Sequence, residues 1–122
     1  MFGSLGMKEM LTHQKKRILI RKTDGYEVRS IDDLSYCTVA GDHVSMAFAD
    51  GSRCELKRSL TFVEQALDSP FMIRIHPSHL INICHAKYYL NKGQNIVVMD
   101  DEEELDVSKS NRSKIFNCMK RL

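Results

Sequence analysis

The 122-residue chain lacks any apolar run approaching the roughly 18–20 residues that a membrane-spanning helix requires. Residues 1–6 also lack the basic end and the long apolar stretch of a secretory signal. These two absences predict a cytoplasmic protein with no membrane segment. The length is that of one ordinary domain, so a second independent core is not expected.

The sequence also lacks a paired-cysteine motif, because no two of its four cysteines are spaced as Cys-x-x-Cys. In a chain without an export signal, free thiols in apolar surroundings are the default interpretation. In an oxidising compartment three disulfide pairings would be possible, and the sequence favours none of them. The cysteines are Cys37, Cys54, Cys84 and Cys118.

Motifs of catalysis are missing as well: there is no Gly-x-Ser-x-Gly, no phosphate-binding loop and no His-Glu-x-x-His. The acidic run at 100–104 lacks the spacing of a calcium loop. His76 and His79 have a spacing that suits a metal on a helix, but Pro77 argues against a helix there. A zinc site needs about four converging ligands. We therefore expect neither an enzyme nor a cofactor, and a small zinc module stays a minor alternative.

The formal net charge is only +2, and this figure hides an uneven distribution. Residues 8–29 hold seven basic and three acidic side chains, and residues 107–122 hold five basic and no acidic ones. Residues 100–106 hold six acidic and no basic ones. Cations and hydroxyls from Ser108 to Lys114 lie at the start of a predicted helix, a favourable place for phosphate. Charge alone leaves open whether this segment binds phosphate or is only a solvated surface.

Short stretches of alternating apolar and small or polar residues predict a mainly β fold. Asp-Gly pairs at 24–25 and 50–51 predict tight turns between strands. One continuous β-like run is expected over 81–90. Strands are also expected near 17–21, 26–31, 34–40, 43–49, 52–57, 71–75, 95–99 and 105–107.

Two helices are expected among these strands. Leu60, Val63 and Leu67 recur at helical spacing, with either Thr61, in a capping box with Glu64, or Ser59 as the cap. A terminal helix begins at Ser108 or Ser110 and carries an apolar stripe. The stripe consists of Ile115, Phe116, Met119 and Leu122. The sequence thus predicts several small antiparallel sheets, one short internal helix and a C-terminal helix, with a flexible segment at 1–14 and a domain at 15–122.

Four segments, in order, resemble the LytTR family, the DNA-binding domain of LytR/AgrA-type bacterial response regulators. Residues 71–82 read Phe-Met-Ile-Arg-Ile-His-Pro-Ser-His-Leu-Ile-Asn, which is similar to the family's central signature. Residues 36–44, 58–60 and 105–110 resemble its first loop and strand, its Arg-x-Ser-Leu segment and its terminal Leu-Pro-Val-Ser-Arg-Ser. The resemblance spans 15–122.

The resemblance implies that loops, rather than a recognition helix, read double-stranded DNA in three places. The implied contacts are Asp42 and His43 in the first loop, Arg74, His76, Pro77 and Ser78 in the second, and Ser108, Lys109 and Arg112 in the third. Polar side chains suited to base edges are His43, Ser78 and Asn111.

The family also implies binding to direct-repeat sites by two copies, as a homodimer on DNA, and a receiver domain in a longer parent protein. Lys109 stands where the family usually has arginine. Pro77, Asp106 and the acidic hairpin at 100–104 motivate an alternative. In that alternative the chain is a protein-interaction or regulatory module that keeps the fold and has weakened or lost DNA binding.

Overall fold

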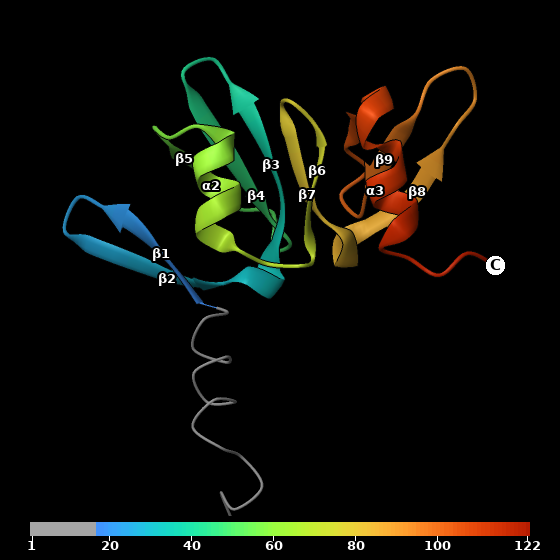
Figure 1. The fold of residues 1–122 in the computed structure, drawn as a ribbon. Coiled ribbons are helices and arrows are strands. Elements are labelled where there is room, and N and C mark those ends of the chain that lie inside the picture. The colour runs from blue at the N-terminus through green and yellow to red at the C-terminus, as the bar shows by residue number, and fades with distance from the viewer. Residues whose placement is uncertain (1–16) are drawn as a thin grey trace, which may run out of the picture. The chain divides into compact units, whose positions relative to one another are not determined.

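The computed structural model describes residues 17–122, so the flexible segment predicted at 1–14 lies outside the described residues. The chain divides into two compact units, with the boundary between Asp33 and Leu34. In the first unit, strands β1 (Arg17–Lys22) and β2 (Gly25–Ser30) form an antiparallel hairpin, followed by the 3-10 turn η2 (Ile31–Asp33) (Figure 1). The predicted Asp-Gly turn therefore joins the first two strands.

The second unit contains two antiparallel sheets (Figure 1). A five-stranded sheet has the order β5-β4-β3-β7-β6, and a three-stranded sheet has the order β10-β9-β8. The predicted fold class is confirmed. The strands are β3 (Leu34–Ala40), β4 (His43–Phe48), β5 (Arg53–Leu56), β6 (Met72–His76), β7 (His79–Asn82), β8 (Ala86–Leu90), β9 (Ile96–Met99) and β10 (Glu104–Asp106).

Both faces of the five-stranded sheet are covered. Helix α2 (Leu60–Leu67) packs on one face and contacts β3, β6 and β7. The opposite face joins the three-stranded sheet and helix α3 (Arg112–Asn117) in one apolar core. Within the described residues, no helix has the length and apolar character needed to cross a membrane. The core residues are Tyr36, Ala47, Ile75, Ile81, Val97, Met99, Leu105, Val107 and Ile115.

The start of α2 is fixed by Ser59 rather than Thr61, so the capping box led by Thr61 is wrong. The hydroxyl of Ser59 accepts the Phe62 N–H at 3.0 Å, which satisfies one of the unpaired donors at the helix start. The helix ends at Leu67, and the next residue, Asp68, caps it in the left-handed conformation, two residues before Pro70.

The continuous strand predicted over 81–90 is wrong, because a 3-10 turn, η3 (Ile83–His85), separates β7 from β8. The cause is the Asn82 side chain, whose oxygen accepts the Cys84 N–H at 2.9 Å. Such a local bond from side chain to backbone competes with strand pairing. The break lets β7 and β8 belong to different sheets.

The terminal helix is shorter than its apolar pattern predicts. It begins as the 3-10 turn η4 (Lys109–Asn111) and continues as α3, which ends at Asn117. Ser108 occupies the cap position but makes no capping bond from its side chain. Ile115 is buried, whereas Phe116 and Met119 are more than two-fifths exposed, so the predicted apolar stripe is wrong. Only Ile115 faces the core; the ring of Phe116 instead lies 5.0 Å from that of Tyr89.

Asn82 is a buried polar residue that joins two distant parts of the sheet. Its Nδ2 donates to the Leu34 carbonyl at 3.0 Å, while its oxygen holds η3. We expect Asn82→Ala to lower the free energy of unfolding by about 1–3 kcal/mol, because the buried Leu34 carbonyl loses its side-chain partner. Urea unfolding measures this loss. The control Asn117→Ala, at an exposed position of α3, should change stability by less than about 0.5 kcal/mol, and equal losses would contradict the assignment.

Candidate nucleic-acid interface

The pairing of β3 with β7 brings two distant turns to one end of the five-stranded sheet. Thr38 lies opposite His79 in this pairing, and the Val39 N–H donates to the Ser78 carbonyl at 3.0 Å. The turn between β3 and β4 therefore lies beside the turn between β6 and β7. Both turns are at the upper end of the sheet in Figure 1.

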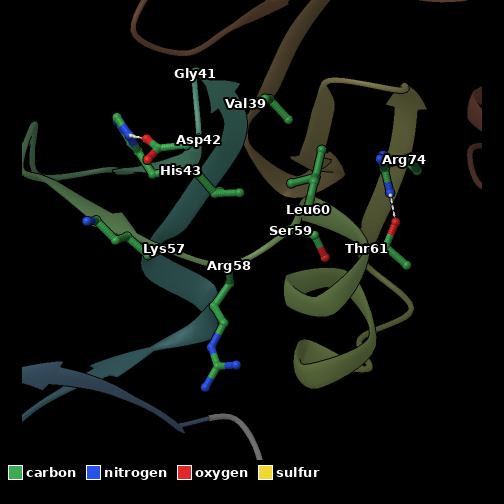
Figure 2. A pocket seen from close by; sticks show the side chains of 11 residues that line it. Val39, Gly41, Asp42, His43, Lys57, Arg58, Ser59, Leu60, Thr61 and Arg74 are labelled. Carbon is green, nitrogen blue, oxygen red and sulfur yellow. Dashed lines mark hydrogen bonds and ion pairs between the residues drawn. The ribbon is translucent and has the colours of Figure 1, made fainter.

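An open groove of about 430 Å³ lies at this end of the sheet, beside the start of α2. In Figure 2, Asp42 and His43 lie on one side of it, and Arg74 and Thr61 lie on the other. Lys57 and Arg58 also line the groove and are exposed. The full lining is Val39, Gly41, Asp42, His43, Val44, Lys57, Arg58, Ser59, Leu60, Thr61 and Arg74.

His43 is held between two carboxylates. Its Nδ1 lies 3.2 Å from the Asp42 Oδ1, and its Nε2 lies 3.3 Å from the Glu55 Oε2. The ring is a little over one-quarter exposed, whereas both carboxylates are largely exposed. The partner groups thus orient a ring that solvent still reaches.

Arg74 directs all three guanidinium nitrogens toward the protein. Nε donates to the His76 carbonyl at 3.1 Å and Nη2 to the Pro77 carbonyl at 2.5 Å. Nη1 donates to Thr61 Oγ1 at 3.3 Å and forms an ion pair with Glu64 at 3.1 Å. The side chain is only 19% exposed. Arg74 therefore joins the β6–β7 turn to the first turn of α2.

The β6–β7 turn presents His76 in a defined tautomer. The Ser78 N–H can only donate, and it lies 3.0 Å from His76 Nδ1, so Nδ1 acts as the acceptor. In the neutral ring the proton is therefore on Nε2. Pro77 has no backbone N–H, and its carbonyl accepts from Arg74. The turn thus offers the Nε2–H donor of His76.

The third predicted contact segment begins beside β6. The Ser108 N–H donates to the Ile75 carbonyl at 2.8 Å, and η4 contacts β6. Asn111 Nδ2 donates to the Ser108 hydroxyl at 2.5 Å, and Lys109 is exposed. The structure thus places this segment next to the β6–β7 turn.

Arg112 is tied to the loop between β8 and β9. With the Asn95 amide oriented to satisfy its neighbours, its oxygen accepts from Arg112 Nε at 3.0 Å and Nη2 at 2.7 Å. The Asn95 nitrogen then donates to the Tyr89 hydroxyl at 2.6 Å. Burial raises the pKa of Tyr89, an effect that the Arg112 charge partly offsets. Like Arg74, Arg112 is engaged within the protein.

The three predicted segments thus converge. One groove is lined by Arg74, Asp42 and His43. The Ser108 N–H donates to the carbonyl of Ile75, which directly follows Arg74. Lys57 and Arg58 also belong to this surface, although neither is among the contacts expected from the sequence. The signal was present, since a pair of basic residues directly precedes the Ser59 cap of a helix.

The acidic run lies at the other end of β3. Ser35 Oγ lies 3.5 Å from Asp100 Oδ1, and the Tyr36 hydroxyl donates to Asp101 at 2.8 Å. Burial, and then the bond to Asp101, raise the pKa of Tyr36 to about 12. A seven-residue strand is roughly 20 Å long, so the acidic hairpin lies far from the groove despite its nearness to Ser108 in sequence.

His76 and His79 lie close together at the β6–β7 turn. Their ring centroids are 4.9 Å apart, and the structure, as far as it describes the chain, holds no group of three or more metal-ligating side chains. Nδ1 of His79 is buried and lacks a hydrogen-bond partner among residues 17–122. Burial lowers the pKa of His79, and the neighbouring His76 ring lowers it further, although Asp106 and the Ser78 backbone act in the opposite direction.

We expect this environment to make stability depend on pH. The unfolded ring titrates near its ordinary pKa of about 6.5, whereas the folded ring binds its proton only at lower pH. The contribution of the neutral His79 ring to the free energy of unfolding is fully present above about pH 6.5. It is lost as the pH falls through the folded pKa of His79. Urea unfolding between pH 7 and pH 5 should show a steeper loss for the unmodified chain than for His79→Gln. Equal pH dependence in the two proteins would contradict this account.

Comparison with known proteins agrees with this architecture. The family model described as the LytTr DNA-binding domain matches residues 24–120. Among solved structures, the chain is similar to the LytTr DNA-binding domain of a methyl-accepting/DNA response regulator from Bacillus cereus, with 22% identity and a TM-score of 0.70. The match covers 84% of this chain and 95% of that one. No curated protein matches. Since the family model spans most of its length, the chain belongs to the LytTR family of DNA-binding domains.

Proposed function

We propose that this domain binds double-stranded DNA sequence-specifically, through loops, as part of a bacterial transcriptional regulator. The observation that carries the proposal is the convergence of three polar segments at one end of a sheet whose other end carries the acidic run. DNA binding requires cations that reach phosphates and donors that reach base edges. Both kinds of group lie at this end, together with the carboxylates of Asp42, Glu55 and Glu64, whereas Asp100 and Asp101 of the acidic run lie at the other end.

The exposed cations are the proposed phosphate contacts. Lys57 and Arg58 line the groove, and Lys109 lies at the start of η4 beside β6. Each has its charge on a flexible side chain, and each is exposed. Loss of one such contact weakens binding to all duplexes and reduces the salt dependence.

The proposed base contacts are groups whose orientation is already fixed. His43 is set by two carboxylates that are largely exposed, so one of them can release a ring nitrogen to a base. The His76 Nε2–H is set by the Ser78 amide, and Asn111 by Ser108. Asp42 and Ser108 act as orienting partners, and the Pro77–Ser78 segment forms the turn itself. Prior orientation favours specificity because less side-chain freedom is lost on binding.

Assembly is also proposed from the family. Two copies are expected to bind direct repeats, as a homodimer on DNA, and a receiver domain is expected in a longer parent protein. The setting for this activity is the cytoplasm.

We expect Lys109→Gln to weaken binding to any duplex and to flatten the plot of log affinity against log salt by about one unit. Lys87→Gln removes the same charge at the acidic end of the molecule, where Lys87 is paired with Glu102. This control should leave the slope unchanged. Fluorescence anisotropy with a mixed-sequence duplex, measured across salt concentrations, gives both slopes. An unchanged slope for Lys109→Gln would remove Lys109 from the interface.

A selection of bound duplexes from a random pool tests binding and specificity together. We expect the unmodified chain to enrich one motif and His43→Ala to enrich a motif with at least one position relaxed, since a good base contact contributes about 1–3 kcal/mol of discrimination. The matched control is His85→Ala, whose ring pairs with Asp100 at the acidic end. It should recover the original motif. No retention of any duplex by the unmodified chain, even at low salt, would favour the protein-interaction alternative.

A further inference from the structure

We infer that Arg74 does not contact the duplex but is a positioning residue, which holds the β6–β7 turn in the conformation that presents His76 to DNA. This inference rests on the proposed function and deepens it. It departs from the simplest expectation for an arginine in a DNA-binding groove, which is a phosphate contact.

The hydrogen-bond donors of Arg74 are mostly in use within the protein. Arg74 makes four hydrogen bonds within the protein, at 2.5–3.3 Å, and they involve every nitrogen of the guanidinium. Two of the acceptors are successive carbonyls of the turn, and two are side chains of α2. Four of the five N–H donors are thus in use, so a bidentate contact with phosphate would require at least one of these bonds to break.

The charge of Arg74 already has a partner within the protein. Glu64 lies 3.1 Å from Arg74 Nη1 and already neutralises much of its charge. The Arg74 side chain is also only 19% exposed. Releasing a partly buried guanidinium from its carboxylate leaves both charges poorly compensated, which is costly. Lys57 and Arg58, in contrast, are exposed residues that line the same groove. The Arg58 guanidinium lies over the Phe62 ring, 4.5 Å from its centre, a stacking contact that leaves the N–H edge of the guanidinium open to phosphate.

The hydrogen bonds of Arg74 hold the β6–β7 turn in place. The backbone carbonyl of His76 accepts a hydrogen bond from Arg74, and the ring Nδ1 of His76 accepts one from the Ser78 N–H. On the other side of the turn, the Ser78 carbonyl accepts from Val39 in β3. The turn is therefore anchored both to α2 and to β3. Removing Arg74 releases the His76 and Pro77 carbonyls from α2, so the turn keeps only its anchor to β3 and the position of the His76 ring is less constrained.

The test compares Arg74→Ala with Arg58→Ala on a duplex that the unmodified chain recovers from the random pool. Arg58→Ala should lower the salt slope by about one unit, as a lost phosphate contact does. Arg74→Ala should lower affinity about tenfold, the scale of one lost base contact, with the slope unchanged. A slope reduced by about one unit in Arg74→Ala would overturn the inference.

A double-mutant cycle shows whether Arg74 acts through His76. If it does, Arg74→Ala combined with His76→Ala should bind no more weakly than the weaker single variant. Additive losses would overturn the inference, because independent contacts add. A merely structural effect on stability does not produce this coupling when circular dichroism shows all variants folded at the assay temperature.

Glu64→Ala tests the same arrangement without changing the arginine. If Arg74 positions the turn, loss of its anchor should weaken binding even though a negative charge leaves the interface. If Arg74 contacts phosphate, the same variant frees the guanidinium and should bind more tightly. The two readings thus predict opposite signs. A failure of the unmodified chain to bind any duplex would instead overturn the proposed function, so the two failures are distinguishable.

Discussion

The arrangement of the interface depends on the antiparallel pairing of β3 with β7. It is the one pairing within residues 17–122 that joins strands that do not follow each other along the chain. Tyr36 lies opposite Ile81, 45 residues later, and Asn82 reinforces the join by its bond to the Leu34 carbonyl. Without this pairing the β3–β4 turn and the β6–β7 turn belong to separate hairpins. With it, they lie side by side, and η4 adds to the same end through Ile75.

The same strand holds the acidic hairpin at a distance from the groove. At its start, Tyr36 links Arg53 and Asp101 through its buried hydroxyl, which fixes the acidic hairpin at that end. At its other end, β3 leads into Asp42, His43 and the exposed cations of the groove. The tip of the acidic run therefore lies away from the groove, whereas Asp106 lies close enough to His79 for its charge to act on the pKa of that ring.

Sequence patterns were sufficient for the types of most elements. Alternation in β4, the turns at Asp24-Gly25 and Asp50-Gly51, and the helical spacing of Leu60, Val63 and Leu67 all predicted local structure correctly. The patterns failed where one side chain bonded locally to the backbone. Asn82 broke the run at 81–90, and the Ser59 hydroxyl, rather than Thr61, capped α2. Such bonds depend on geometry that apolar periodicity does not encode.

By itself the sequence determined the β-rich fold class, the membership of a DNA-binding family and the residues of the interface that we propose. Only the tertiary structure decided which of those residues remain available to a ligand. Arg74 and Lys109 are both cations in predicted contact segments, yet one is engaged by four bonds and the other is exposed. The physical reason is that two of the acceptors for Arg74, Thr61 and Glu64, lie on a separate helix 13 and 10 residues earlier in the chain. Only folding brings them within hydrogen-bond distance of Arg74. No local sequence pattern therefore indicates that the guanidinium is already hydrogen-bonded within the protein.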